Sequence, residues 1–314
     1  MQTPKYAIDY RRRSVVDGRM VYPITALRDV GSHIKKGDQG GCISGEHNLS
    51  HDDASWVHQG AYALDDCLVM ENAQVFGFAK ISGEAVIRGH ARVYGDAIVT
   101  GNAIVSGWAK VYDEAFVTGT SQVMHEATVC GVSEVKGEAV VMDHAEILGC
   151  SRIEGRAIVM DYALVAENAA VRGDARICNN ACVTDNAIVC GFARLEGQSA
   201  AINEAIVMDR AILKGNAIAH KQMVIGGEVW CNGIDHSIHP ETAWLTGRSG
   251  YSRGFEIGWP DIFAALRTFI IHDPEVGSRL LKRIWNRRSW NRSNKWLKSE
   301  ELKKPVNHST QEEV

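Results

Sequence analysis

The sequence predicts an all-β parallel solenoid, and a repeat of six residues carries this prediction. From Ser55 to Ala217 every sixth residue is Ala, Ser or Cys, at 28 consecutive positions without an insertion or deletion. Two residues after each small residue comes an aliphatic one, as in Val69 and Val75, and two further on comes a turn former, most often glycine. Alternating inward residues followed by a turn describe a very short strand and a corner. Three such hexads make one triangular coil of 18 residues.

Stacked coils explain each position of the repeat. Coils stacked at about 4.8 Å pair each backbone with the next one, so residues 55–222 make about nine coils. Three side chains meet in each narrow layer, so the inward position needs Ala, with Val or Ile filling the remaining volume. Gly, Asp, Asn and His recur at the corner, and this choice indicates a positive φ there.

The two ends of the stack need covers, because an open last coil offers a sheet edge to other chains. Residues 1–54, rich in glycine and charge, are expected to form an N-terminal cap of irregular or short-stranded structure. After residue 222 the repeat fails, and we treat residues 223–257 as a transition segment. Residues 258–314 are predicted to hold two α-helices and a basic tail, with Asp273-Pro274 starting the second helix. These helices would cover the open coil or a side face.

Charge and cysteine content restrict the class of protein. The net charge is −4, yet residues 275–304 alone carry +7 with three tryptophans interleaved. A basic tail docked on an acidic body is favoured over binding to nucleic acid or to an anionic membrane. The chain begins without a signal-peptide pattern and contains no membrane-spanning run, which predicts a cytoplasmic protein. Its eight cysteines include no CxxC pair, which is typical of reduced thiols.

One column of corners departs from the glycine rule. Four successive coils place His, Asp, Asp and Asn where the other corners mostly keep glycine. Because residues 18 apart lie in adjacent coils, His125 is expected beside Asp143, and Glu126 beside His144. The column reads Gly89-His90, Gly107-Trp108, His125-Glu126, Asp143-His144, Asp161-Tyr162 and Asn179-Asn180.

The hexad pattern resembles the hexapeptide-repeat family of left-handed parallel β-helices. The segments Thr25-Ala-Leu-Arg-Asp-Val and Lys36-Gly-Asp-Gln-Gly-Gly resemble the leader that precedes such repeats in a group of bacterial and phage proteins. The resemblance implies a left-handed coil, an acyltransferase that uses acyl-CoA, with acetyl-CoA the favoured donor, and a homo-oligomer, most often a trimer. The acceptor is left open.

The resemblance also implies a histidine of the solenoid as the general base, in a cleft between subunits. Acyl transfer from a thioester requires removal of a proton from the attacking hydroxyl or amine. We assign this role to His144 first and His125 second, with Asp143, Glu126 or Asp161 as orienting carboxylates. The alternative is a corner ladder of hydrogen bonds without catalysis.

A groove for the donor is predicted on the face that leads into this column. Its outward apolar residues should be covered by a second subunit or by the C-terminal helices. An acyl-CoA lying here would pass its pantetheine arm over Met142 and Met160, with its phosphates at Arg176, Arg194 and Lys214. Alternatively, Glu196 neutralises Arg194 as a solvated ion pair. The apolar residues are Leu68, Met70, Val86, Ile104, Met124, Val140, Met142, Ile158 and Met160.

Two other functions stay open. A branch of this fold family comprises zinc-dependent carbonic anhydrases, but His90 and His144 lie three coils or about 14 Å apart, too far for one ion, so no metal site is expected. His236 and His239, past the solenoid, lack recognised ligand spacing. The run 55–222 leaves no room for the extruded loop of many hexapeptide acyltransferases, which favours a non-catalytic structural or assembly module.

Overall fold

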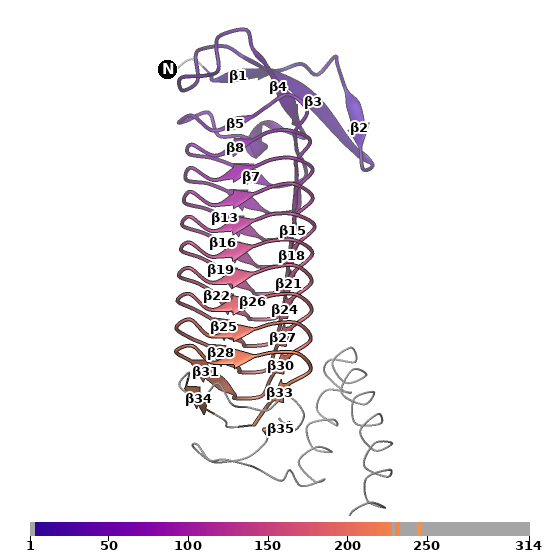
Figure 1. Cartoon of the computed structure of the whole chain (residues 1–314). Helices are drawn as coiled ribbons and strands as arrows, with labels where there is room; N and C mark the ends of the chain where they lie inside the picture. The colour runs from indigo at the N-terminus through magenta and orange to yellow at the C-terminus, as the bar shows by residue number, and fades with distance from the viewer. Residues whose placement is uncertain (1–3, 228–229, 233–243, 246–314) are drawn as a thin grey trace, which may run out of the picture. The chain divides into compact units, whose positions relative to one another are not determined.

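The computed structural model of the chain describes residues 4–227, 230–232 and 244–245, which form a β-solenoid with strands at one end (Figure 1). The predicted all-β parallel solenoid is confirmed. The 3-10 helix η1 (Glu46–Asn48) is the only helix among the described residues, and none of them belongs to a helix able to cross a membrane. The predicted helices and basic tail of residues 258–314, and most of residues 223–257, lie outside the described part.

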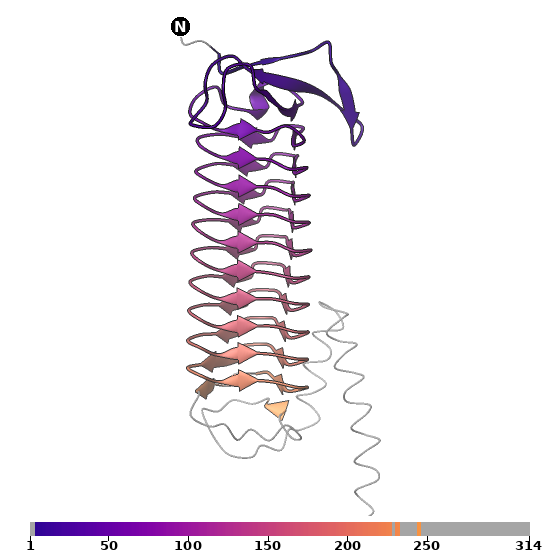
Figure 2. The ribbon, with the colours of Figure 1, turned by 45° about the horizontal axis from the view of Figure 1, so that its top comes forward.

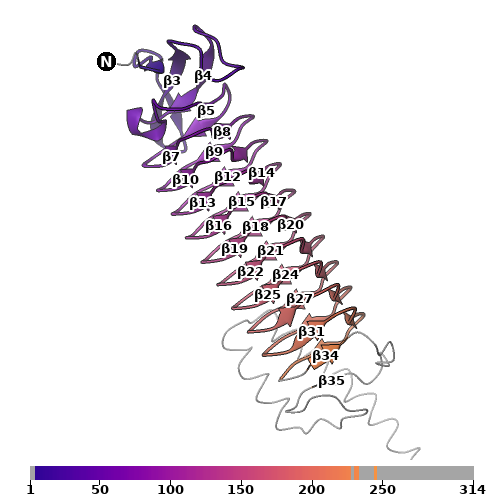
Figure 3. The ribbon, with the colours of Figure 1, turned by 90° about the vertical axis from the view of Figure 1, so that its left-hand side faces the viewer.

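Three sheets run along the stack of coils, one on each side (Figures 2 and 3). Sheet 1 consists of β1 (Tyr6–Ile8), β2 (Ser14–Val16), β3 (Arg19–Ala26), β4 (Gln39–Ile43), β6 (Tyr62–Ala63), β9 (Lys80–Ile81), β12 (Ile98–Val99), β15 (Phe116–Val117), β18 (Glu134–Val135), β21 (Arg152–Ile153), β24 (Ala170–Val171), β27 (Ile188–Val189), β30 (Ile206–Val207), β33 (Val224–Ile225) and β35 (Trp244–Leu245).

Sheets 2 and 3 hold ten strands each. Sheet 2 consists of β7 (Leu68–Val69), β10 (Val86–Ile87), β13 (Ile104–Val105), β16 (Gln122–Val123), β19 (Val140–Val141), β22 (Ile158–Val159), β25 (Arg176–Ile177), β28 (Arg194–Leu195), β31 (Ile212–Lys214) and β34 (Trp230–Asn232). Sheet 3 consists of β5 (Trp56–Val57), β8 (Gln74–Val75), β11 (Arg92–Val93), β14 (Lys110–Val111), β17 (Thr128–Val129), β20 (Glu146–Ile147), β23 (Leu164–Val165), β26 (Cys182–Val183), β29 (Ala200–Ala201) and β32 (Ile218–Ala219).

From β5 to β31 each strand pairs in parallel with the strand 18 residues later, as Val86 does with Ile104. The small and the aliphatic residue of every hexad point inward, and Ala85 and Ile87 are fully buried. Parallel pairing continues past residue 222 into β33, because Met223 fills the position of the small residue and is itself buried. The core is therefore one continuous column of Ala, Val and Ile side chains.

The corners have the positive φ that the sequence predicts. Along the corner between sheets 2 and 3, φ is 72° at Gly107, 60° at His125 and 61° at Asp143. The corners of adjacent coils also lie very close together. A Cβ atom added to Gly107 would meet the carbonyl oxygen of His125 at 2.8 Å. The residue above His125 therefore has both a backbone and a packing reason to be glycine.

The N-terminal strands extend sheet 1, and their pairing is antiparallel where the pairing of the coils is parallel. Strands β1, β3 and β4 pair antiparallel, and β4 then pairs in parallel with β6 of the first complete coil. The side chain of Lys5 is buried at this junction, where its Nζ donates to the carbonyl oxygen of Ser55 at 2.8 Å and to the Ser55 hydroxyl at 3.0 Å. The Tyr6 hydroxyl donates to the Leu49 carbonyl at 2.8 Å. These buried bonds fix the cap to the first coil.

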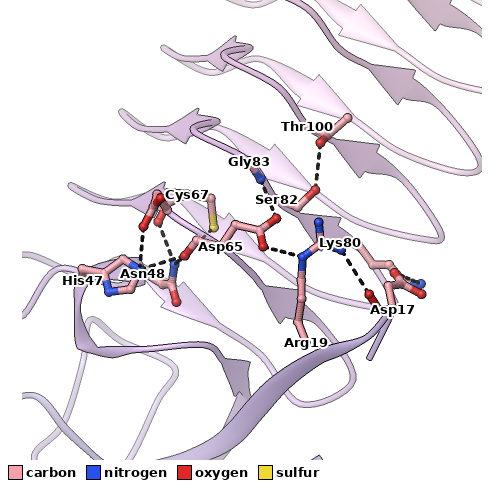
Figure 4. A network of polar contacts seen from close by, with 11 residues as sticks. Asp17, Arg19, His47, Asn48, Asp65, Cys67, Lys80, Ser82, Gly83 and Thr100 are labelled. Atoms are coloured by element: carbon pink, nitrogen blue, oxygen red, sulfur yellow. Dashed lines mark hydrogen bonds and ion pairs between the residues drawn. The ribbon is translucent and has the colours of Figure 1, made fainter. Parts of the chain in front are cut away.

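The β2–β3 hairpin also contacts the solenoid through charged groups (Figure 4). Asp17 at the hairpin turn accepts from Lys80 Nζ at 2.9 Å, and Arg19 pairs with Asp65. The second carboxylate oxygen of Asp65 accepts the backbone N–H of Gly83 at 3.1 Å. Asp65 thus joins the hairpin to two successive coils.

Candidate functional site

The residues of the unusual column lie on one edge of the solenoid, between sheets 2 and 3, and we call this edge the histidine corner. Each coil contributes two successive residues to it, the first with positive φ. The first residues are Gly89, Gly107, His125, Asp143, Asp161 and Asn179, and the second are His90, Trp108, Glu126, His144, Tyr162 and Asn180.

His125 and Asp143 form the closest contact between an imidazole and a carboxylate at this corner. Nδ1 of His125 lies 2.8 Å from Oδ1 of Asp143. An ionised carboxylate only accepts, so Nδ1 carries the hydrogen and Nε2 keeps a free lone pair. The His125 side chain is 57% exposed, so this lone pair can meet a molecule from solvent.

His144 is held differently. Its Nδ1 lies 3.5 Å from Oε2 of Glu126, and its ring stacks on Tyr162 with centroids 4.7 Å apart and planes 9° from parallel. Glu126 is 62% exposed, so it orients the imidazole less firmly than Asp143 orients His125. His125 is therefore the more firmly oriented of the two imidazoles, although the sequence placed His144 first.

The carboxylate of Asp161 does not reach either imidazole. Its Oδ2 accepts the backbone N–H of Asn179 at 2.8 Å and the Asn179 side-chain amide at 3.1 Å. Asn179 in turn accepts the N–H of Gly197 at 3.1 Å. Asp143 makes two kinds of contact. Its Oδ1 lies beside the imidazole of His125, and its Oδ2 lies 3.4 Å from the backbone nitrogen of Asp161.

The same backbone capping occurs where no histidine is present. Asp185 accepts the N–H of Asn203 at 2.7 Å, and Asp209 accepts the N–H of Gly227 at 2.9 Å, both at other corners. An acidic or amide side chain at a corner thus satisfies the N–H of the next corner. Asp161 and Asn179 follow this general rule, whereas the pairing of His125 with Asp143 departs from it.

The outward apolar residues lie on sheet 2, as predicted. Val140 and Ile158 are neighbours in register, and Met142 and Met160 follow them toward the histidine corner. All four are partly exposed. The face is therefore an apolar strip that leads to His125 and His144.

Two arginines continue this strip. Arg176 and Arg194 are exposed partners in register on β25 and β28, and within the described residues neither guanidinium has a hydrogen-bond or ion-pair partner. Burial is the main cause that raises the pKa of the Cys178 thiol, and the positive charges of Arg194 and Arg176 oppose this shift. Glu196 pairs with Lys214 at 3.1 Å, and its carboxylate forms no ion pair with Arg194 within the described residues. The same contact engages Lys214, which the sequence had grouped with the two arginines.

Metal-ligating side chains can be compared only within the part of the chain that the structure describes. There, no group of three or more His, Cys, Asp or Glu side chains is arranged to hold an ion. His236 and His239 lie outside that part.

Comparison with known proteins supports the repeat architecture. A family model described as the YdcK beta solenoid repeat matches residues 91–107 and 175–191. The two segments are short parts of the chain and support a β-solenoid repeat protein. No curated protein matches the chain.

Proposed function

We propose that the protein is an acyltransferase that moves an acyl group from acyl-CoA, with acetyl-CoA the favoured donor, to a hydroxyl or amine. The hydrogen bond between His125 and Asp143 carries the proposal. It supplies an exposed imidazole whose tautomer is set by a carboxylate, as a general base needs.

In the proposed reaction Nε2 of His125 takes a proton from the acceptor as its oxygen or nitrogen attacks the thioester carbonyl. The tetrahedral intermediate then collapses, the carbon–sulfur bond breaks, and the imidazolium returns the proton to the departing thiolate of CoA. Asp143 is a positioning residue that holds the ring and stabilises its charged form. His144, near Glu126, is the second candidate for the base.

The donor would lie along sheet 2. Arg176 and Arg194 stand three and four coils beyond the coil of His125, or about 14 and 19 Å along the axis. They supply the positive charge for the CoA phosphates. The apolar strip with Met142 and Met160 lies between and would contact the pantetheine arm.

A second copy of the chain would complete the site. Within the residues that the structure describes, the strip is partly exposed and His125 is open to solvent. A homo-oligomer, most simply a trimer, would cover the strip and form the opposite wall of a cleft. We place the reaction in the cytoplasm, an assignment that agrees with eight cysteines free of disulfides.

The test is a transfer assay with the purified full-length chain, acetyl-CoA and panels of sugar and amine acceptors, read by mass spectrometry of the product. His125→Gln should lower the rate by about 100-fold or more. His90→Gln is the matched control, because His90 stacks on Trp108 in the same column with centroids 4.0 Å apart. An unchanged rate in the His125 variant would reject the assignment of the base.

A non-catalytic assembly module is the second candidate. The observation that favours it is the backbone capping by Asp185 and Asp209, which serves stability alone. This function predicts no turnover with any acceptor and an oligomer that Ile158→Lys dissociates. Sedimentation of wild type and variant, together with the transfer assay, separates the two functions.

A further inference from the structure

Several cations on the solenoid are paired with carboxylates. Lys136 lies 3.2 Å from Glu134 and 3.1 Å from Glu154, and Arg156 lies 2.8 Å from Asp174. The partner stands either two residues away on the same strand and turn or 18 residues away on the next coil. Opposite charges facing each other across strands stabilise a sheet, and like charges facing each other destabilise it.

Sheet 3 breaks this rule beside the histidine corner. Arg92 and Lys110 are in register on adjacent strands β11 and β14, so their backbones lie about 4.8 Å apart. Both side chains are exposed. Neither has a hydrogen-bond or ion-pair partner within the described residues. Two neighbouring cations are thus left without an ion pair, although the Asp113 carboxylate lies near enough to act on the adjacent Tyr94 phenol.

The next column of sheet 3 adds hydroxyl groups. Tyr94 and Tyr112 follow Arg92 and Lys110 by two residues, and their rings stack with centroids 4.7 Å apart and planes 3° from parallel. Burial is the main cause that raises the pKa of Tyr94, so its phenol stays protonated and can donate a hydrogen bond. The guanidinium of Arg92 lies near enough to act on this phenol.

We propose that Arg92 and Lys110, together with the Tyr94 hydroxyl, form a binding site for a phosphate or diphosphate group. A guanidinium offers a planar fork of donors that matches the oxygens of a phosphate, and an ammonium adds a compact charge. A bound dianion removes the repulsion between the two cations. The site lies on a different sheet from Arg176 and Arg194 and does not rest on acyl transfer. Its ligand is a phosphorylated small molecule.

Calorimetric titration of the full-length protein with inorganic pyrophosphate at low ionic strength tests this site. Wild type should bind two equivalents per chain, one at each unpaired cation pair. The R92Q/K110Q variant should bind one equivalent, at Arg176 and Arg194. The R176Q/R194Q variant should also bind one equivalent, at Arg92 and Lys110. Arg88→Gln is the matched control. Arg88 is an exposed cation between β10 of sheet 2 and the histidine corner, without a hydrogen-bond or ion-pair partner for its guanidinium within the described residues, and its loss should leave two equivalents.

Circular dichroism of each variant confirms that the coils remain folded. A second variant, Arg92→Glu, should abolish the sheet 3 site outright, whereas R92K/K110R should keep it. Unchanged stoichiometry and affinity in R92Q/K110Q would overturn the proposal. So would a wild-type protein without saturable binding, or an equal loss in the Arg88 control.

Discussion

His125 and Asp143 stand one coil apart on the same edge of the solenoid and meet through Nδ1 and Oδ1 at 2.8 Å. Both residues adopt the positive φ of a corner, at 60° and 61°. Parallel strands in register fix their separation, so the pair is as rigid as the sheets that hold it. Asp143 also caps the next corner, and its two oxygens therefore serve different purposes.

Replacing Asp143 by Asn should separate these two purposes. Asn still accepts the backbone N–H of Asp161 but no longer balances the charge of an imidazolium. We expect kcat for acyl transfer to fall by about 10-fold or more, with KM for acetyl-CoA unchanged and the pH profile shifted. Asp185→Asn, at a corner without histidine, is the matched control. Equal loss of kcat in both variants would point to a structural effect instead.

Truncating a corner carboxylate should cost stability wherever the corner lies. Asp185→Ala and Asp161→Ala each leave a backbone N–H of the next coil without its acceptor, at 2.7 and 2.8 Å in the native chain. A lost hydrogen bond of this kind costs about 1 kcal/mol. Urea unfolding followed by circular dichroism measures it. A cost confined to one of the two variants would contradict a capping role that is common to the corners.

The corner above His125 should not tolerate a side chain. Gly107→Ala places a Cβ atom 2.8 Å from the carbonyl oxygen of His125 at a φ of 72°. The strained backbone and the clash together should cost more than about 1 kcal/mol. Ala at Glu126, an exposed position on the same edge, should cost little. Equal urea midpoints for the two variants would show that the corners can separate.

The buried ammonium of Lys5 should make stability depend on pH. Burial and then the Arg28 guanidinium lower the pKa of Lys5 to about 8, below about 10.4 for an unfolded chain. Between these values the unfolded chain binds more protons, so Lys5 raises stability as pH increases from 8 to 10, by less than about 1.4 kcal/mol per pH unit.

Tyr6 acts in the opposite direction above this window. Burial, followed by Glu46, raises its pKa, so the folded chain holds the phenol proton longer and stability falls above about pH 10.

The Lys5 prediction is tested below the range in which Tyr6 acts. Urea midpoints at pH 7, 8, 9 and 10 should rise in wild type relative to Lys5→Met. Parallel curves for the two proteins would contradict a lowered pKa for Lys5 in the folded chain.

Periodicity predicted the solenoid because each hexad position has one physical requirement. The inward Ala and Val positions admit few substitutes, and the 18-residue register follows from three hexads per coil. The same arithmetic predicted that His125 would meet Asp143. The 18-residue register could not show which neighbour a side chain contacts when several lie at a similar separation. Asp161 turns to the backbone of Asn179, and Glu196 prefers Lys214 to Arg194, because side-chain rotamers decide these contacts.

The N-terminal end was less predictable. Its pairing joins residues far apart in the sequence, as Tyr6 with Ala26 and Cys42 with Tyr62. No repeat marks these pairs, and long-range strand pairing depends on turns and burial that a short segment does not reveal. The buried Lys5 could not be inferred either, because lysine is among the residues least often buried.

Calorimetric titration with acetyl-CoA tests the donor site most directly. Saturable binding to the groove on sheet 2 is expected, with free CoA competing for the same site. R176Q/R194Q should weaken it by about 10-fold or more, since each arginine loses a charge-assisted contact to phosphate. R92Q/K110Q should leave it unchanged. No binding at millimolar acetyl-CoA, or equal affinity in wild type and R176Q/R194Q, would contradict an acyl-CoA groove on sheet 2.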